Sequence, residues 1–237
     1  MAARPHRPVF WGLLVLGLIC LGPGAFILFR TAGVQTFSIS SGSMEPTLLI
    51  GDIFAVNKSA YGYSHYSLPF SPPLFSGRIL AAEPKRGDLV VFRLMRTDLD
   101  YVKRIVGLPG DRIQMRGGEL YINGTAVKRD RVADFAYTSD GRTQRVKRWR
   151  ETLPSGTSYE TIDLRDNDFL DDTQEFTVPP GNYFVLGDNR DNSLDSRMPT
   201  EFGYVPAENL IGRIMMIVYS AGSDGVPRTD RIGLEPK

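Results

Sequence analysis

The stretch DRIQMRGGELYINGTAV, residues 111–127, decides the fold class of this chain. Apolar and polar side chains alternate along it, which is the period of a half-buried strand. Gly117-Gly118 and Asn123-Gly124 interrupt the alternation with residues that adopt the positive φ angles of tight hairpin turns. The stretch therefore predicts a β-meander.

Short β-rich runs that end in turn residues lie on both sides of this meander. They are DIFAVNK (52–58), DLVVFRLM (88–95), YVKRIVG (101–107), NYFVLG (182–187) and IGRIMMIVYS (211–220). No segment after residue 30 sustains the 3.6-residue period of an amphipathic helix. We therefore expect a mainly β protein.

The N-terminal region contains an uncharged apolar run, residues 9–29, that matches the roughly 20 residues needed to cross a bilayer. We predict an uncleaved transmembrane anchor, with Arg4 and Arg7 favouring a cytoplasmic N-terminus. The alternative is a cleaved signal peptide, but the run exceeds the usual apolar core of such a peptide and no convincing small-x-small site follows it.

We expect four parts: a cytoplasmic segment 1–8, the anchor 9–29, an exported β domain formed by 30–127 and 179–237, and an inserted lobe 128–178. The lobe contains the basic run RTQRVKRWR (142–150) followed by an acidic run. Such runs are usually solvated faces, and a partner or lipid headgroup site is the lesser alternative. The Pro-rich segment 61–75 is either a packed surface loop or an aromatic rim on the membrane.

Composition excludes several classes of function. The 28 Lys and Arg residues balance 27 Asp and Glu residues, so no global charge indicates nucleic acid binding. The single cysteine, Cys20, excludes an internal disulfide, and the two histidines are too few for a zinc site. GDNRDNSLDSR (187–197) resembles a calcium loop only superficially, because Ser196 and Phe202 stand where Gly and Glu are required. We expect no metal and no cofactor.

A hydrolytic site could be built from serine and lysine. A Ser-His-Asp triad would have to use His65, because His6 precedes the anchor. A Ser-Lys dyad needs no histidine, but its lysine must have a pKa roughly 2 to 3 below the usual value of about 10.4. Lys103 lies in an apolar strand pattern between Tyr101 and Ile105, where burial would provide that shift. By itself, Ser43 in a Gly-Ser stretch would be read as a turn residue.

Several motifs in order resemble one family, the bacterial type I signal peptidases. SGSMEPTL is similar to the family's serine box and GDIFAVNK to the box after it. KRGDLVVF with YVKRIVGLPGD resembles the lysine box, and GDNRDNSLDSR followed by FGYVP resembles the last box. The resemblance covers residues 34–127 and 179–220, behind an N-terminal anchor.

The resemblance implies that Ser43 is the nucleophile and Lys103 the general base. The main-chain N–H of Ser43 and the hydroxyl of Ser41 would form the oxyanion hole, and Ser193 would hydrogen-bond the lysine amine. Side chains that would make the surroundings of the lysine dry are Phe92, Tyr101 and Val185. Residues that would brace the last box through ion pairs are Asp188, Arg104, Asp195 and Arg197.

The resemblance also implies the substrate. The segment VQTFSIS (34–40) would be an edge strand to which an extended peptide adds. Phe37, Ile39 and Val102 would wall shallow pockets that admit small side chains, as in an Ala-x-Ala site before the cut. The expected partners are signal-peptide-bearing preproteins and the lipid bilayer, without nucleic acid, and the oligomeric state stays open. The expected location is the bacterial plasma membrane, with the catalytic domain on the extracytoplasmic side.

The Ser-Lys pair and the anchor also occur, separately or together, in proteins with other functions. Organellar inner-membrane peptidases and pilin-maturing peptidases share the dyad. A short chain without a large insertion would favour those enzymes, but this chain has an insertion. Self-cleaving SOS repressors also use Ser and Lys, but they carry a DNA-binding domain and no anchor. A non-catalytic scaffold that only binds signal sequences would lack Ser43 or Lys103, and both are present.

Overall fold

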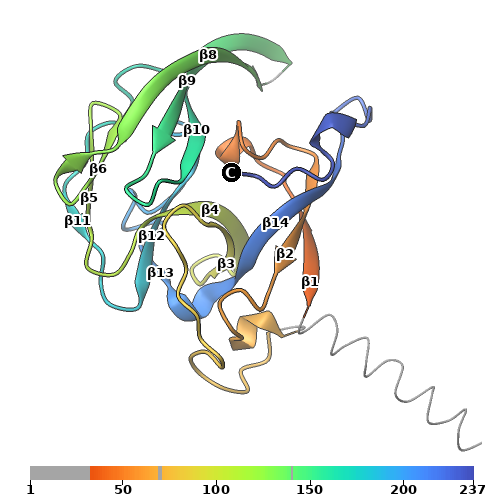
Figure 1. Cartoon of the computed structure of the whole chain (residues 1–237), viewed down its shortest axis with the longest axis vertical. Coiled ribbons are helices and arrows are strands. Elements are labelled where there is room, and N and C mark those ends of the chain that lie inside the picture. The colour runs from red at the N-terminus through yellow and green to blue at the C-terminus, as the bar shows by residue number, and fades with distance from the viewer. Residues whose placement is uncertain (1–32, 69–70, 140) are drawn as a thin grey trace, which may run out of the picture.

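A computed structural model describes residues 33–237 apart from 69, 70 and 140. The predicted cytoplasmic segment and anchor lie outside these residues. Within the described part, no helix has the length and apolarity needed to cross a bilayer. The described chain forms strands joined by loops and short 3-10 helices, so the mainly β class is confirmed (Figure 1).

The largest sheet has seven antiparallel strands in the order β1-β2-β14-β3-β4-β12-β13. Their bounds are β1 Val34–Ser38, β2 Asp52–Asn57, β14 Leu210–Ser220, β3 Leu89–Leu94, β4 Leu99–Gly107, β12 Asn182–Leu186 and β13 Val205–Pro206. β1 is an edge strand with alternating burial, as its sequence pattern predicts. β12 pairs with β4 only from Arg104 to Gly107, so the first half of β4 has an open edge on that side.

The predicted meander forms a second sheet with the order β11-β5-β6-β7. Its strands are β5 Arg112–Arg116, β6 Glu119–Ile122, β7 Thr125–Ala126 and β11 Phe176–Thr177. Gly117, Gly118, Asn123 and Gly124 all have positive φ angles, which gives the two tight turns that the sequence predicts. β11 lies within the predicted lobe but pairs with β5 of the meander.

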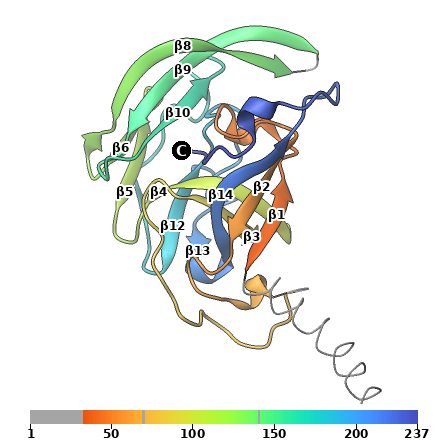
Figure 2. The ribbon, with the colours of Figure 1, turned by 45° about the vertical axis from the view of Figure 1, so that its right-hand side comes forward.

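The third sheet, β10-β9-β8, is built from the charged segment. β8 Lys128–Ser139 and β9 Arg142–Thr152 form a long hairpin, and β10 Ser158–Asp163 pairs with β9. The hairpin arches over the short helix η1 Gly42–Met44, and two views agree on this placement (Figures 1 and 2). The other 3-10 helices are η2 His65–Ser67, η3 Ala207–Asn209 and η4 Thr229–Arg231.

The sequence pattern did not predict the hairpin strands β8 and β9, because they are rich in charged residues. Most side chains of β8 and β9 are exposed or half-buried, so no apolar alternation marks them. Cross-strand ion pairs such as Arg148 with Glu160 and Arg150 with Glu160 take the place of apolar contacts.

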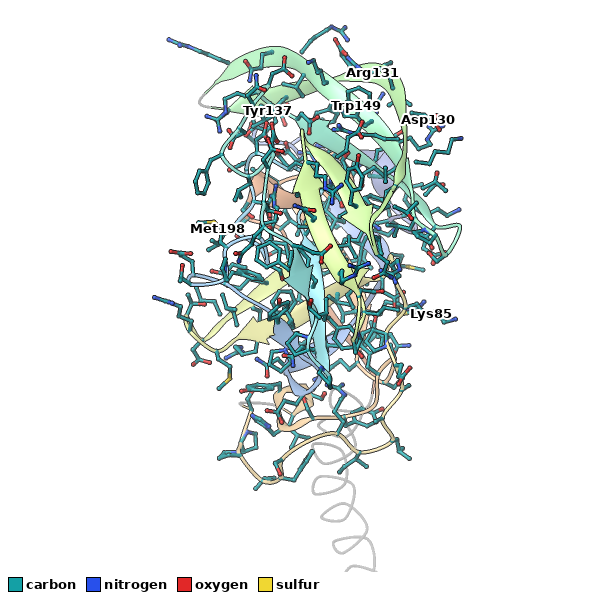
Figure 3. The ribbon with its side chains drawn as sticks, turned by 90° about the vertical axis from the view of Figure 1, so that its left-hand side faces the viewer. Lys85, Asp130, Arg131, Tyr137, Trp149 and Met198 are labelled. Carbon is teal, nitrogen blue, oxygen red and sulfur yellow. The ribbon has the colours of Figure 1, made fainter. Side chains whose placement is uncertain are left out.

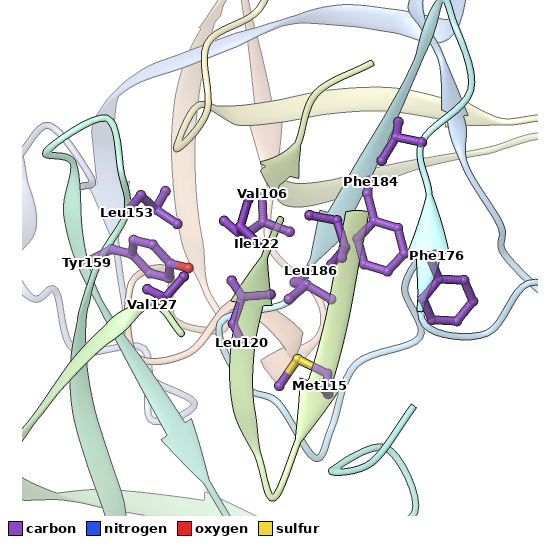
Figure 4. Close-up of a cluster of buried hydrophobic side chains, with 12 residues drawn as sticks. Val106, Met115, Leu120, Ile122, Val127, Leu153, Tyr159, Phe176, Phe184 and Leu186 are labelled. Carbon is purple, nitrogen blue, oxygen red and sulfur yellow. The ribbon is translucent and has the colours of Figure 1, made fainter. Parts of the chain in front are cut away.

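One apolar cluster joins all three sheets (Figure 4). Val106 and Phe184 come from the large sheet, Met115 and Leu120 from the meander, and Tyr159 from the sheet of the hairpin. All five are buried. Apolar burial of this kind contributes about 25 cal/mol per Å², so the three sheets stabilise one another.

Candidate active site

Ser43 lies in η1, the turn that follows edge strand β1. The turn is held by Asn189 of the loop after β12, whose backbone N–H donates to the carbonyl of Ser43 at 3.2 Å. The Asn189 side-chain amide donates to the carbonyl of Gly42 at 3.1 Å. These two bonds fix the backbone on which the Ser43 hydroxyl is mounted.

Lys103 projects from β4, where it pairs with Val90 of β3. Its Nζ lies 2.6 Å from Ser43 Oγ, although the two residues are 60 positions apart in the chain. The residue is only 2% exposed. The structure thus brings a buried amine into hydrogen-bond contact with a half-buried hydroxyl.

The surroundings of Lys103 change its protonation. Burial lowers the pKa of the amine from 10.5 to about 8, against the opposing effect of Asp195 and Asp188. Tyr101 and Ile105 lie on the same face of β4 and belong to an apolar cluster that also contains Phe92 and Val185. Desolvation disfavours the charged form of an amine, so this cluster favours a neutral lysine near neutral pH.

A cavity of about 260 Å³ opens beside the dyad. Its lining includes Ser41, Ser43, Lys103, Ile39 and Val102. Ser41 Oγ lies 3.4 Å from Ser43 Oγ. Of the predicted pocket residues, Phe37 is not part of this lining and instead stacks on Phe54, with ring centroids 6.1 Å apart.

Comparison with known proteins supplies the family. A family model described as "Signal peptidase, peptidase S26" matches residues 10–219. The chain belongs to this family. Signal peptidase I of Rickettsia akari is 42% identical over 212 residues, which cover 86% of this chain and 76% of the relative. Signal peptidase I of Rickettsia massiliae is 42% identical over 219 residues, which cover 89% and 79%.

These relatives confirm the resemblance seen in the motifs and the enzyme class, a serine peptidase of the signal peptidase I type. A crystal structure of a signal peptidase I from Enterococcus faecalis is 30% identical, with a TM-score of 0.34. The match covers 56% of this chain and 97% of the Enterococcus chain.

Ser193 departs from its expected place in this signal peptidase. The structure contains no hydrogen bond between Ser193 and Lys103, whose amine bonds Ser43. Ser193 Oγ is buried without a hydrogen-bond partner among the described residues. It packs instead against the backbone of Gly187.

Gly187 begins the last motif, GDNRDNSLDSR, but the sequence pattern predicted no role for it. A Cβ atom on Gly187 would lie 2.2 Å from Ser193 Oγ and 2.6 Å from the carbonyl oxygen of Ser43. No real Cβ contact is that short, so only glycine allows the loop after β12 to approach the nucleophile turn.

Two ion pairs lie under the site. Arg104 donates two hydrogen bonds to Asp188, at 2.8 and 2.6 Å, and Arg197 donates two to Asp195, both at 2.9 Å. All four side chains are at most 1% exposed. Asp195 also accepts a bond from the backbone N–H of Gly187 at 3.1 Å, so this pair supports the loop that touches Ser43.

A third buried pair links the site to the hairpin sheet. Arg190 donates to both carboxylate oxygens of Glu151, at 2.8 and 2.6 Å, and the Tyr159 hydroxyl donates to Glu151 at 2.8 Å. Burial alone would raise the pKa of Glu151, but Arg190 and Tyr159 more than offset it and hold the pKa low. Sequence reasoning missed this pair because Glu151 merely ends a basic run, 39 positions from Arg190.

Proposed function

We propose that this chain is a membrane-anchored endopeptidase that removes signal peptides from exported preproteins, with Ser43 as nucleophile and Lys103 as general base. The contact between Lys103 Nζ and Ser43 Oγ, 2.6 Å apart with the lysine buried, carries the proposal. A neutral amine at this distance accepts the serine proton directly, so no histidine is needed.

The proposed reaction follows from the site. Ser43 Oγ attacks the carbonyl carbon before the scissile bond while its proton moves to Lys103 Nζ. The oxyanion is met by the backbone N–H of Ser43 and the hydroxyl of Ser41, which is 3.4 Å from Ser43 Oγ. The lysine then returns its proton to the leaving amine, and water releases the acyl group by the reverse sequence.

The substrate would bind as an added strand. β1 is the edge of the large sheet, and the first half of β4 has an open edge beyond its pairing with β12. An extended peptide between them can use main-chain hydrogen bonds from either edge. Ile39 and Val102 narrow the cavity there, which favours small side chains before the cut.

The other predicted site residues would position Ser43 and Lys103 or shield them from water. We propose that Arg104 with Asp188 and Arg197 with Asp195 hold the loop and strand that aim the dyad, and that Ser193 fills the space over Gly187. Phe92, Tyr101 and Val185 would keep water from Lys103. The residues 9–29 would anchor the chain in the bacterial plasma membrane with the catalytic domain on the extracytoplasmic side.

The test uses purified full-length protein in detergent with a preprotein that carries an Ala-x-Ala site. Wild type and Ser43→Ala are incubated in parallel, and the new N-terminus is sequenced. We expect cleavage after the second Ala by the wild type alone. Cleavage by both proteins would refute Ser43 as nucleophile, and binding without cleavage by the wild type would favour a signal-sequence scaffold.

A further inference from the structure

The active site has a second side that the proposed reaction does not use. Gly42, Glu45 and Asn192 lie next to Ser43 in the structure but outside the lining of the substrate cavity. A Cβ atom on Gly42 would lie 3.4 Å from Glu45 Cδ and 3.5 Å from Asn192 Nδ2. Gly42 and Glu45 are buried and Asn192 is exposed, so of these three residues only Asn192 can contact a peptide that leaves the cavity past Ser43.

The hairpin β8–β9 continues this second side. The exposed Asn192 side-chain amide donates to the Tyr137 hydroxyl of β8 at 3.3 Å. This bond ties the hairpin to the loop after β12, whose Asn192 lies beside Gly42 of the nucleophile turn. The ribbon shows the hairpin passing over η1 (Figures 1 and 2). Figure 3 views the hairpin from its outer side and labels Tyr137 on it.

Strand register divides the hairpin tip into two faces. Gln144 pairs with Tyr137, and Arg142 pairs with Ser139, two positions beyond Tyr137. Directly paired residues, and residues two apart on one strand, share a face. Gln144 and Arg142 therefore lie on the face of Tyr137, whereas Arg145, which pairs with Ala136, lies on the opposite face.

The charges on this tip differ from those nearer the base of the hairpin. Lys147 forms an ion pair with Asp166, and Arg148 forms an ion pair with Glu160. Arg142 and Arg145 are exposed and form no ion pair with any residue that the structure describes. An exposed arginine on the face above the active site favours an anionic group bound there.

Tyr137 itself is buried with Val146 and Ile162, whereas Gln144 and Arg142 farther along the same face are exposed. We propose that this exposed tip of the β8–β9 hairpin binds the first residues of the mature chain, downstream of the scissile bond, and that Arg142 favours an acidic side chain among them. The inference rests on the proposed function, because it names where the second half of the same substrate lies. An extended chain advances about 3.3 Å per residue, so a residue several positions after the bond is the one that would lie beside Arg142.

The test varies one residue of the substrate and one arginine of the enzyme. Three preprotein-derived peptides carry the same Ala-x-Ala site and differ only in Ser, Glu or Lys at the fourth residue after the bond. Wild type, Arg142→Ser and Arg145→Ser are compared as full-length proteins in detergent at low salt, and kcat/KM is measured for each pair. Arg145→Ser is the matched control, since it removes the same charge from the opposite face of the same hairpin.

We expect wild type to cleave the Glu peptide roughly threefold faster than the Lys peptide, as for an exposed charge pair. Arg142→Ser should lose this preference while cleaving the Ser peptide as wild type does, and Arg145→Ser should keep it. Adding 0.5 M salt should weaken the preference in wild type by screening.

Three results overturn the inference. The first is equal cleavage of the Glu and Lys peptides by wild type, which leaves the proposed function intact because all three peptides are cut. The second is a preference that both arginine variants lose equally, which indicates a general field of the hairpin. The third is failure of wild type to cut any of the peptides, which refutes the proposed function and this inference with it.

Discussion

At the scale of single residues, the protonation of Lys103 should govern activity. Its pKa of about 8 in the buried site means that most of the amine is protonated below that pH and cannot accept the serine proton. We therefore expect kcat/KM to fall about tenfold per pH unit below pH 8 and to level off above it. A limb with a midpoint near 6.5 would instead point to a histidine, and His65 would be the candidate.

The variant Lys103→Arg belongs to the same prediction. Guanidinium stays protonated at any working pH, so the variant should be inactive across the whole profile. Thermal unfolding of the variant distinguishes loss of the base from loss of the fold. Substantial turnover by a folded Lys103→Arg protein would exclude Lys103 as the general base.

Ser41 offers a second test at this scale. If its hydroxyl donates to the oxyanion, Ser41→Ala should lower kcat by about 10², as for loss of one oxyanion-hole donor. Ser41 is exposed, so its substitution should leave the unfolding temperature unchanged. An unchanged rate would remove Ser41 from the oxyanion hole.

Glu45 gives a prediction about stability. Burial raises the pKa of its carboxyl from 4.5 to about 7, although Arg228 and Arg231 oppose the shift. The folded state therefore binds a proton that the unfolded state releases, and stability falls as pH rises from about 4.5 through 7. Glu45→Gln should be more stable than wild type by about 1 kcal/mol at pH 8 and no more stable at pH 4. Urea unfolding at the two pH values measures this, and an equal effect at both would refute the explanation.

At the scale of elements, the ion pair between Arg190 and Glu151 connects the loop after β12 to the end of β9. Both side chains are 1% exposed, so removing one partner leaves a buried charge. We expect Glu151→Gln to destabilise the protein by about 3 kcal/mol. The double variant Glu151→Gln/Arg190→Met should recover part of that loss, because no buried charge then remains. If both proteins lose equally, packing and not charge explains the effect.

At the scale of the whole molecule, the apolar cluster shared by the three sheets predicts cooperative unfolding. Trp149 on β9 reports the hairpin sheet by fluorescence once Trp11 is replaced by Phe, and activity reports the large sheet. We expect both signals to change at the same urea concentration, as in a two-state transition. Fluorescence that changes first would show that the predicted lobe 128–178 is a separate unit.

Some elements of this fold could be predicted from local sequence signals, and others could not. Local signals determined the meander, since positive φ angles at Gly117, Gly118, Asn123 and Gly124 depend on the residues themselves. The strands with apolar alternation and the order of the family's motifs were also readable, because both depend on nearest neighbours along the chain. The charged strands β8 and β9 were not, because their pairing replaces apolar alternation with cross-strand contacts.

The sequence by itself determined the mainly β class, the family, and the serine and lysine proposed to carry the chemistry. Only the tertiary structure decided the 2.6 Å contact between Lys103 and Ser43, the need for glycine at position 187, the pairing of Arg190 with Glu151, and the placement of the hairpin over η1. The physical reason is distance along the chain. Turn geometry and strand period are local properties, whereas burial, and the pKa and close approach that it produces, arises only when segments far apart in the chain pack together.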